Sequence, residues 1–125
     1  MSNDEFVNEY EEIVKRILNL AEKAKNEGFL SLEEMIDKDK YHQREIIDLG
    51  LRLVIDGTDS QFINKILTNI VNLETDTDRK ILKTIEKEGI LGIQEGLNRR
   101  LLLILLNSYV NVGIEDTMKQ LNEEI

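Results

Sequence analysis

The chain has 125 residues, with 25 acidic side chains against 16 basic ones, a formal net charge of −9, and neither Cys nor Pro. This length suits a single domain with its own core, and the lack of Cys excludes thiol chemistry, disulfides and Cys-based metal sites. So acidic a surface repels phosphate groups, which makes nucleic acids and anionic membrane surfaces poor partners.

The first predicted helix begins at the N-terminus and ends at Gly28. Ser2 and Glu5 fit a capping box, in which each side chain accepts a hydrogen bond from an N–H of the first turn. The opening stretch has no basic segment followed by an apolar one, so no secretory signal is expected and the predicted location is the cytoplasm. The apolar residues then recur at three- and four-residue steps, as on one face of a helix; they are Phe6, Val7, Tyr10, Ile13, Val14, Ile17, Leu18, Ala21 and Ala24.

Two helices are expected next. Ser31 and Glu34 fit a second capping box, which would open a short helix ending near Ile36. A longer helix is predicted from about residue 41 to residue 56, and its wide apolar face suits a central place in a bundle.

Gly57 separates that helix from another amphipathic one. A glycine adopts the left-handed conformation that ends many helices, and Thr58 with Gln61 is expected to cap the next helix. Polar residues occupy the opposite side of this helix. Its apolar stripe comprises Phe62, Ile63, Ile66, Leu67, Ile70 and Val71.

In the second half, a helix is predicted over about residues 77–87, with Gly89 as its end. A short segment over residues 90–96 leads to Asn98, a favourable cap for a helix that holds the apolar run 101–106. A helix needs about 20 apolar residues to cross a bilayer, so this run predicts no membrane insertion. Because consecutive residues point in nearly every direction, the helix should be enclosed by neighbours or by another chain.

After Gly113, a last amphipathic helix is expected with Ile114, Met118, Leu121 and Ile125 on its apolar face. No segment alternates apolar and polar residues with a β-branched bias, so no strand is needed. The sequence therefore predicts an all-α fold, a compact multi-helix bundle that forms a single domain over residues 1–125.

The two halves of the chain also resemble each other. AKNEGFLSLEE (residues 24–34) aligns with IEKEGILGIQE (residues 85–95), which places Gly28 opposite Gly89. One interpretation is a duplicated helix–short helix–helix unit, with a turn at both glycines. The other is a chance match between helical sequences rich in Glu, Lys, Leu and Ile. The two copies would be residues 13–73 and 74–125.

No set of residues suited to catalysis or metal binding stands out. The single histidine, His42, has no neighbouring Cys or Ser and lies in a charged stretch, so a solvated surface position is expected. A calcium loop starting at Asp37 would need Gly at its sixth position, which is His42. Asp56 and Asp59 are better explained by a helix end and a helix start. We therefore expect no enzyme activity, no metal and no cofactor.

Two regions carry a more specific pattern, KNEGFLSLEE with LGLRLVIDGTDSQFINKIL (residues 25–34 and 49–67), and EGILGIQEGLNRR (residues 88–100). In this order they resemble the cytoplasmic loop and the segment after the last membrane helix of the motility protein A (MotA) family. That family supplies the ion-conducting stator subunit of the bacterial flagellar motor. It typically shows G-L-L-x-L-E-x, then G-L-x-L-x-x-D-G-x-D, and later E-G-I-L-x-I-Q-E-G-x-N-P-R, whose Pro is missing here. The residues that match the first two motifs are Gly28, Leu30, Leu32, Glu33, Gly50, Leu51, Leu53, Asp56, Gly57 and Asp59.

The resemblance implies a partner surface. The family has four membrane helices and this chain has none, so ion conduction is excluded and only the rotor-facing cytoplasmic part remains. In the family, a basic residue before the G-L-L motif and the Glu within it contact the rotor switch protein through opposite charges. By position these are Lys25 and Glu33; Lys keeps the charge of the usual Arg but loses its bidentate geometry. The aligned positions of the second half are Glu86 and Gln94.

Two functions follow from these observations. The resemblance implies a cytoplasmic protein–protein interaction module that binds a protein partner, the flagellar rotor switch protein, through Lys25 and Glu33. The alternative is a self-assembling structural bundle without a link to motility, in which the apolar helix 98–110 forms the contact of a homo-oligomer. An exposed apolar face on residues 101–110 would favour self-assembly. A natural relative without membrane helices, a degenerate duplicate and an engineered fusion of loop and tail are all compatible with the sequence.

Overall fold

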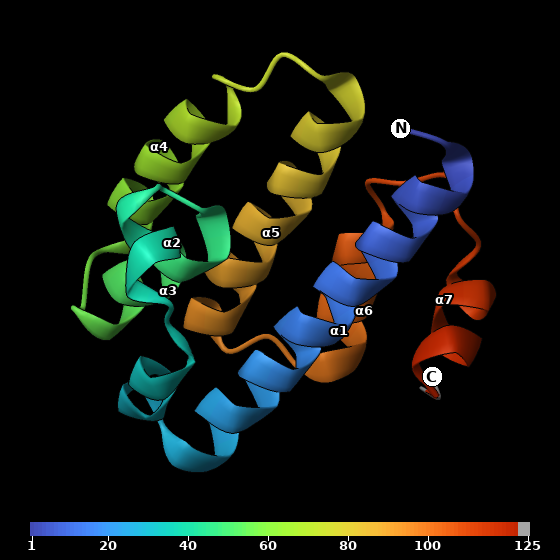
Figure 1. The fold of residues 1–125 in the computed structure, drawn as a ribbon. Coiled ribbons are helices and arrows are strands. Elements are labelled where there is room, and N and C mark those ends of the chain that lie inside the picture. The colour runs from blue at the N-terminus through green and yellow to red at the C-terminus, as the bar shows by residue number, and fades with distance from the viewer. Residues whose placement is uncertain (123–125) are drawn as a thin grey trace.

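The computed structural model describes residues 1–122, and every regular element in that range is a helix (Figure 1). The fold is all-α, a compact bundle, as the periodicity predicted. The two longest helices, α1 (Asn3–Glu27) and α5 (Thr77–Glu95), pack against each other. The other helices are the 3₁₀ helix η1 (Phe29–Met35), α2 (Lys38–His42), α3 (Ile46–Ile55), α4 (Ser60–Val71), α6 (Arg99–Asn107) and α7 (Ile114–Leu121).

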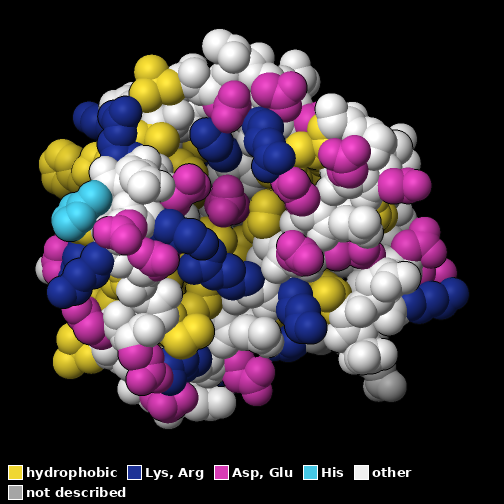
Figure 2. Space-filling model, in the orientation of Figure 1, with side chains coloured by type: hydrophobic (Ala, Val, Ile, Leu, Met, Phe, Trp, Pro, Cys, Tyr) yellow, Lys and Arg dark blue, Asp and Glu magenta, His cyan; other side chains and the backbone are white. Residues whose placement is uncertain are grey.

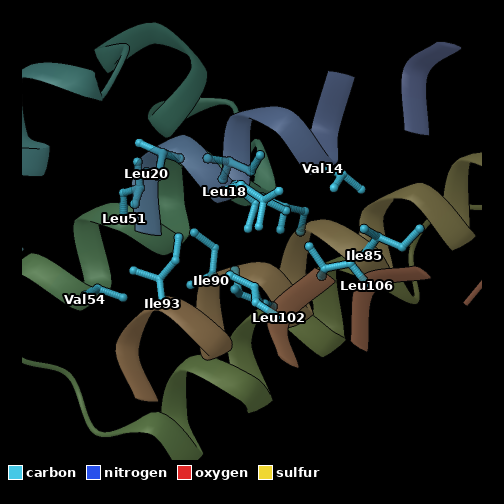
Figure 3. Packing of buried hydrophobic residues seen from close by; sticks show 14 of the residues in the cluster. Val14, Leu18, Leu20, Leu51, Val54, Ile85, Ile90, Ile93, Leu102 and Leu106 are labelled. Carbon is cyan, nitrogen blue, oxygen red and sulfur yellow. The ribbon is translucent and has the colours of Figure 1, made fainter. Parts of the chain in front are cut away.

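Helix α5 lies at the centre of the bundle. It contacts α3 and α4 on one side and α1 and α6 on the other, while α7 packs on the outside of α1 and α6 (Figure 1). The apolar stripes of these helices meet in one core, where each fully buried aliphatic side chain contributes about 1.5–3 kcal/mol. The close view in Figure 3 labels Val14, Leu18, Leu20, Leu51, Val54, Ile85, Ile90, Ile93, Leu102 and Leu106.

Several predicted helix ends are confirmed. The Ser2 Oγ accepts a hydrogen bond from the Glu5 N–H at 3.1 Å at the start of α1. Gly28 ends α1 with a φ of 85°, and Gly57 follows α3 with a φ of 77°. The side chain of Asn98 accepts from the Leu101 N–H at 2.9 Å and caps α6.

The final helix is confirmed as well. Helix α7 begins after Gly113, and both Met118 and Leu121 pack against the core. The fourth residue of the predicted apolar face, Ile125, lies outside the described residues.

The predicted helix end at Gly89 is wrong. Helix α5 continues through Gly89 to Glu95, and the chain leaves it at Gly96 with a φ of 75°. A Cβ at position 89 would overlap the side chain of Ile17. This glycine therefore allows α1 and α5 to approach closely, and it is not the end of a helix.

For the same reason, the predicted segment 90–96 is not separate from the helix before it. The two aligned glycines do not give the same local structure, because the chain turns at Gly28 and runs straight at Gly89. The expected turn in the second half is thus wrong. A common origin of residues 13–73 and 74–125 stays a prediction.

The predicted helix over residues 41–56 is divided in two. Helix α2 ends at His42, Arg44 takes a left-handed φ of 61°, and α3 begins at Ile46. The reason lies in α3, where the buried carboxylate of Asp48 accepts a hydrogen bond from the Asp37 N–H at 3.0 Å. In one straight helix that contained both residues, they would lie roughly 16 Å apart along the axis.

Two predicted caps are also wrong. Ser31 and Glu34 form no capping box, because residues 29–35 form a 3₁₀ helix in which the Ser31 hydroxyl donates to the Gly28 carbonyl at 2.6 Å. The cap of α4 is Asp59, one residue after Thr58, and it accepts from the N–H two positions ahead. Short Asp side chains reach such an N–H readily.

Candidate functional site

The two predicted partner-binding residues lie at one end of the molecule, where α1 passes into η1. Lys25 is exposed in the last turn of α1, where a cation is favourable against the helix dipole. Glu33 is exposed too, but it lies in the second half of η1 and not in the first turn of an α-helix, as was expected. We call the surface formed by Lys25, Phe29, Leu30, Glu33 and Met35 the α1–η1 end.

Glu33 has a partner within the chain. Its Oε1 accepts a hydrogen bond from Arg52 Nη1 at 2.8 Å, and the same guanidinium lies 3.0 Å from Asp56 Oδ1. The hydrogen bond from Arg52 holds the pKa of Glu33 below its usual value, so the carboxylate stays ionised. The Glu33 side chain is nevertheless 59% exposed and open to a partner.

A second ion pair lies beside the first. Lys23 Nζ is 2.7 Å from Glu34 Oε1, and this contact lowers the pKa of Glu34. Lys25, two residues further along α1, forms no ion pair with an acidic side chain among the residues that the structure describes. The α1–η1 end thus presents one uncompensated cation and one carboxylate whose charge is shared.

Apolar side chains are exposed at the α1–η1 end as well. Leu30 is 77% exposed, Met35 45% and Phe29 39%. Lys25 and Phe29 also line a cavity of about 430 Å³ that opens between the second half of α1 and the junction of α5 and α6. Apolar surface rimmed by charged residues is typical of protein-binding sites.

Charged groups are mixed elsewhere on the molecule. Figure 2 shows acidic and basic side chains interspersed over one face, with hydrophobic side chains between them and the single histidine at the edge. His42 is exposed at the end of α2, with its ring centroid 5.0 Å from that of Tyr41. This position agrees with the solvated surface role expected from the sequence.

A charged cluster between α1, α3 and α5 escaped the sequence analysis. The buried Asp48 carboxylate lies 3.6 Å from Arg16 Nη2. Glu86 is partly buried nearby, and its pKa is raised to about 7, first by burial and then by the charge of Glu45. Arg16 and Lys83 oppose this rise. The one sequence signal was an Asp within the apolar run that begins α3.

Within residues 1–122, no group of three or more His, Asp and Glu side chains is arranged as a metal ion requires. In the same range, no helix has both the length and the apolar character needed to cross a bilayer. The Asp residues considered for calcium act as helix caps: Asp37 caps α2, Asp56 ends α3 and Asp59 caps α4.

Comparison with known proteins gives one partial likeness. A stretch of 58 residues, 46% of this chain, is 41% identical to Motility protein A from Treponema phagedenis. The match covers 21% of that protein, so the chain spans about a fifth of the length of this curated relative. No protein-family model matches the chain. No solved structure is significantly similar to it either.

Proposed function

We propose that this chain is a helical protein–protein interaction module, without catalytic activity, that corresponds to the cytoplasmic, rotor-facing part of a flagellar stator subunit. The observation that supports it is the 41% identity to Motility protein A over 58 residues. The exposure of Lys25 and Glu33 at one end of the molecule is compatible with this role, since both side chains can reach a partner.

Opposite charges and an apolar anchor would act together at the α1–η1 end. Lys25 and Glu33 lie on either side of the turn at Gly28, and Leu30 protrudes between them in sequence. Charged groups at the rim of an interface mainly set orientation and association rate, whereas a buried apolar side chain supplies affinity. We therefore expect Leu30 to be covered by the partner.

Lys25 and Glu33 should contribute differently to the affinity for a partner. Glu33 already shares its charge with Arg52, whereas Lys25 has no acidic partner among the described residues. A partner carboxylate would thus gain more from Lys25 than a partner cation gains from Glu33. Reversing Lys25 should weaken binding more than reversing Glu33.

The alternative interpretation treats both residues as ordinary solvated side chains. Lys25 suits the C-terminal end of α1, and Glu33 stabilises Arg52, so each has a structural reason to be present. A binding measurement on charge-reversed variants therefore distinguishes partner binding from a structural role.

The test is binding of the purified rotor switch protein from a flagellated bacterium to the immobilised chain. Wild type, Lys25→Glu and Glu33→Lys would be compared with two matched controls, Lys15→Glu and Glu12→Lys, which reverse exposed charges further along α1. The proposal expects both controls to bind like wild type and both reversals at the α1–η1 end to bind at least tenfold more weakly. Absence of wild-type binding, or equal loss in all four variants, would reject it.

A further inference from the structure

Helix α6 exposes an apolar stripe on the side away from the core. Leu101 is 47% exposed and Ile104 41%, and Tyr109, just beyond the helix, is 37% exposed. The buried side of the same helix is formed by Leu102, Leu103 and Leu106, of which Figure 3 labels Leu102 and Leu106 in the core. Within the single chain the run 101–106 is therefore enclosed on one side only, and of the two predicted options, neighbouring helices or another chain, the second stays a prediction for the exposed side.

The charges at the two ends of α6 run against the helix dipole. Arg99 and Arg100 occupy its first turn, where the partial charge of the helix is already positive. At the other end, the hydroxyl of Tyr109 donates to Glu88 Oε1 at 3.1 Å, which holds a carboxylate near the negative end of the helix. Glu88 also lies 3.7 Å from Lys87, so its charge is partly compensated. Arg99 is compensated within the chain, because its Nη1 lies 3.4 Å from the Leu18 carbonyl oxygen and 3.5 Å from Glu22 Oε2.

The exposed α6 face fits a second copy of this chain, and we infer that two copies associate through it with their α6 helices antiparallel. A two-fold interface must be complementary to itself. In an antiparallel pair, Ile104 lies near the axis and each Leu101 faces the Tyr109 end of the other helix. Each Arg100 then approaches the Glu88 of the other copy. A parallel pair would place the two Arg100 side chains together.

The size of α6 limits the strength of this contact. Its nine residues span roughly 14 Å. An interface built on so short a helix lies at the small end of the range for specific association, where complexes are weak and transient. The two copies should therefore associate in a concentration-dependent manner. This surface is formed by other residues than the α1–η1 end, so the inference does not depend on the proposed function.

The mass of the intact chain in solution tests the inference. Sedimentation or light scattering from about 1 μM to 1 mM should show a rise from one chain mass toward two. Ile104→Asp should keep the chain monomeric over the whole range. The matched control is Phe62→Asp on α4, because Phe62 is equally apolar and 50% exposed; it should associate like wild type.

A charge swap tests the antiparallel register. Arg100→Glu should weaken association at least tenfold, and Arg100→Glu with Glu88→Arg should restore most of it. Circular dichroism of each variant verifies that the fold is kept. A wild type that stays monomeric at the highest concentration overturns the inference, and so does a Phe62→Asp variant that alone abolishes association. Failure of the double variant to recover overturns the antiparallel pairing.

Discussion

Segments 24–34 and 85–95 share a sequence pattern and have different structures. The first turns at Gly28, whose φ of 85° and ψ of 166° are accessible almost only to glycine, and a Cβ there would contact nothing within 4 Å. The second is one continuous helix, in which Gly89 lies against Ile17 and has no room for a Cβ. A glycine can thus be needed for an unusual backbone conformation or for close packing between helices. The neighbouring residues in the sequence do not show which of the two needs applies.

The two segments also differ in the exposure of the positions that carry charge in the first segment. Lys25 and Glu33 are exposed, whereas the aligned Glu86 and Gln94 are partly buried against other helices. Gln94 Nε2 donates to the Thr58 carbonyl at 2.8 Å, a hydrogen bond that a carboxylate could not make. In the first segment these positions carry charged side chains in solvent. In the second segment a charge at the same positions would be partly buried, which costs free energy.

The largest loss of stability is expected from a substitution at Gly89, the glycine that is packed against another helix. Gly89→Val should destabilise the chain by about 3 kcal/mol, because the new side chain overlaps Ile17 in a fully buried contact between α1 and α5. Urea unfolding would measure the loss. Combining it with Ile17→Ala should cost less than the sum of the two single changes, since the smaller residue makes room. Strict additivity would show that position 89 is not packed as described.

The next largest effect is the pH dependence that Glu86 gives to the free energy of unfolding. Its pKa is raised from 4.5 to about 7, so the folded chain binds this proton more tightly than the unfolded chain. The stability from that proton is complete below pH 4.5 and is lost as the pH rises through 7. Glu86→Gln cannot ionise, so at pH 8 it should exceed wild type by about 1–3 kcal/mol and at pH 4 it should match it.

Urea titrations of both proteins at several pH values would measure that difference. Lost attraction to Arg16 and Lys83 reduces the gain without changing its sign. The control is Glu12→Gln, which removes a carboxylate on the exposed side of α1, and the Glu86→Gln curve is compared with it. A difference between Glu86→Gln and wild type that stays constant from pH 4 to 8 would contradict the raised pKa.

A smaller effect is expected at the turn. Gly28→Ala should cost about 1–2 kcal/mol, because alanine must adopt a strained backbone there although its methyl group has room. Gly28→Asn should be no better, since asparagine favours the left-handed helical region and not a ψ of 166°. Thermal unfolding of the two variants provides the measurement, and an Asn variant as stable as wild type would place the turn in a different conformation.

Local sequence patterns predicted most of the helices of this fold. They failed where contacts between residues distant in sequence determine the structure. The helices α1 and α4 were predicted correctly because burial on one face imposes a helical period, although Phe62 and Ile66 of the α4 stripe are exposed. The break between α2 and α3 has no Gly or Pro to mark it; the Asp48 carboxylate holds the Asp37 N–H across the two helices. At the candidate site, the exposed place of Lys25 follows from its position at a helix end.

The ion pair of Glu33 could not be predicted, because its partner is 19 residues away on another helix. The same limit applies to Glu86. A regular helical pattern shows which face is apolar, but it does not show that a carboxylate beside that face will be covered by the helix opposite. Long-range packing therefore decides the charge state of both residues.

The smallest change in stability is expected for Glu33→Gln, and its dependence on pH should be opposite to that of Glu86→Gln. The Arg52 hydrogen bond lowers the pKa of Glu33, so the ionised carboxylate stabilises the fold above pH 4.5 and this contribution is lost as the pH falls through the lowered pKa. Glu33→Gln should therefore be slightly less stable than wild type at pH 7 and equal to it in strong acid. Because Glu33 is well exposed and Arg52 keeps Asp56 as a partner, solvent and salt screen the loss. Paired melting curves at low and high salt would measure it, and a loss that survives high salt would show that the Glu33–Arg52 contact is shielded from solvent.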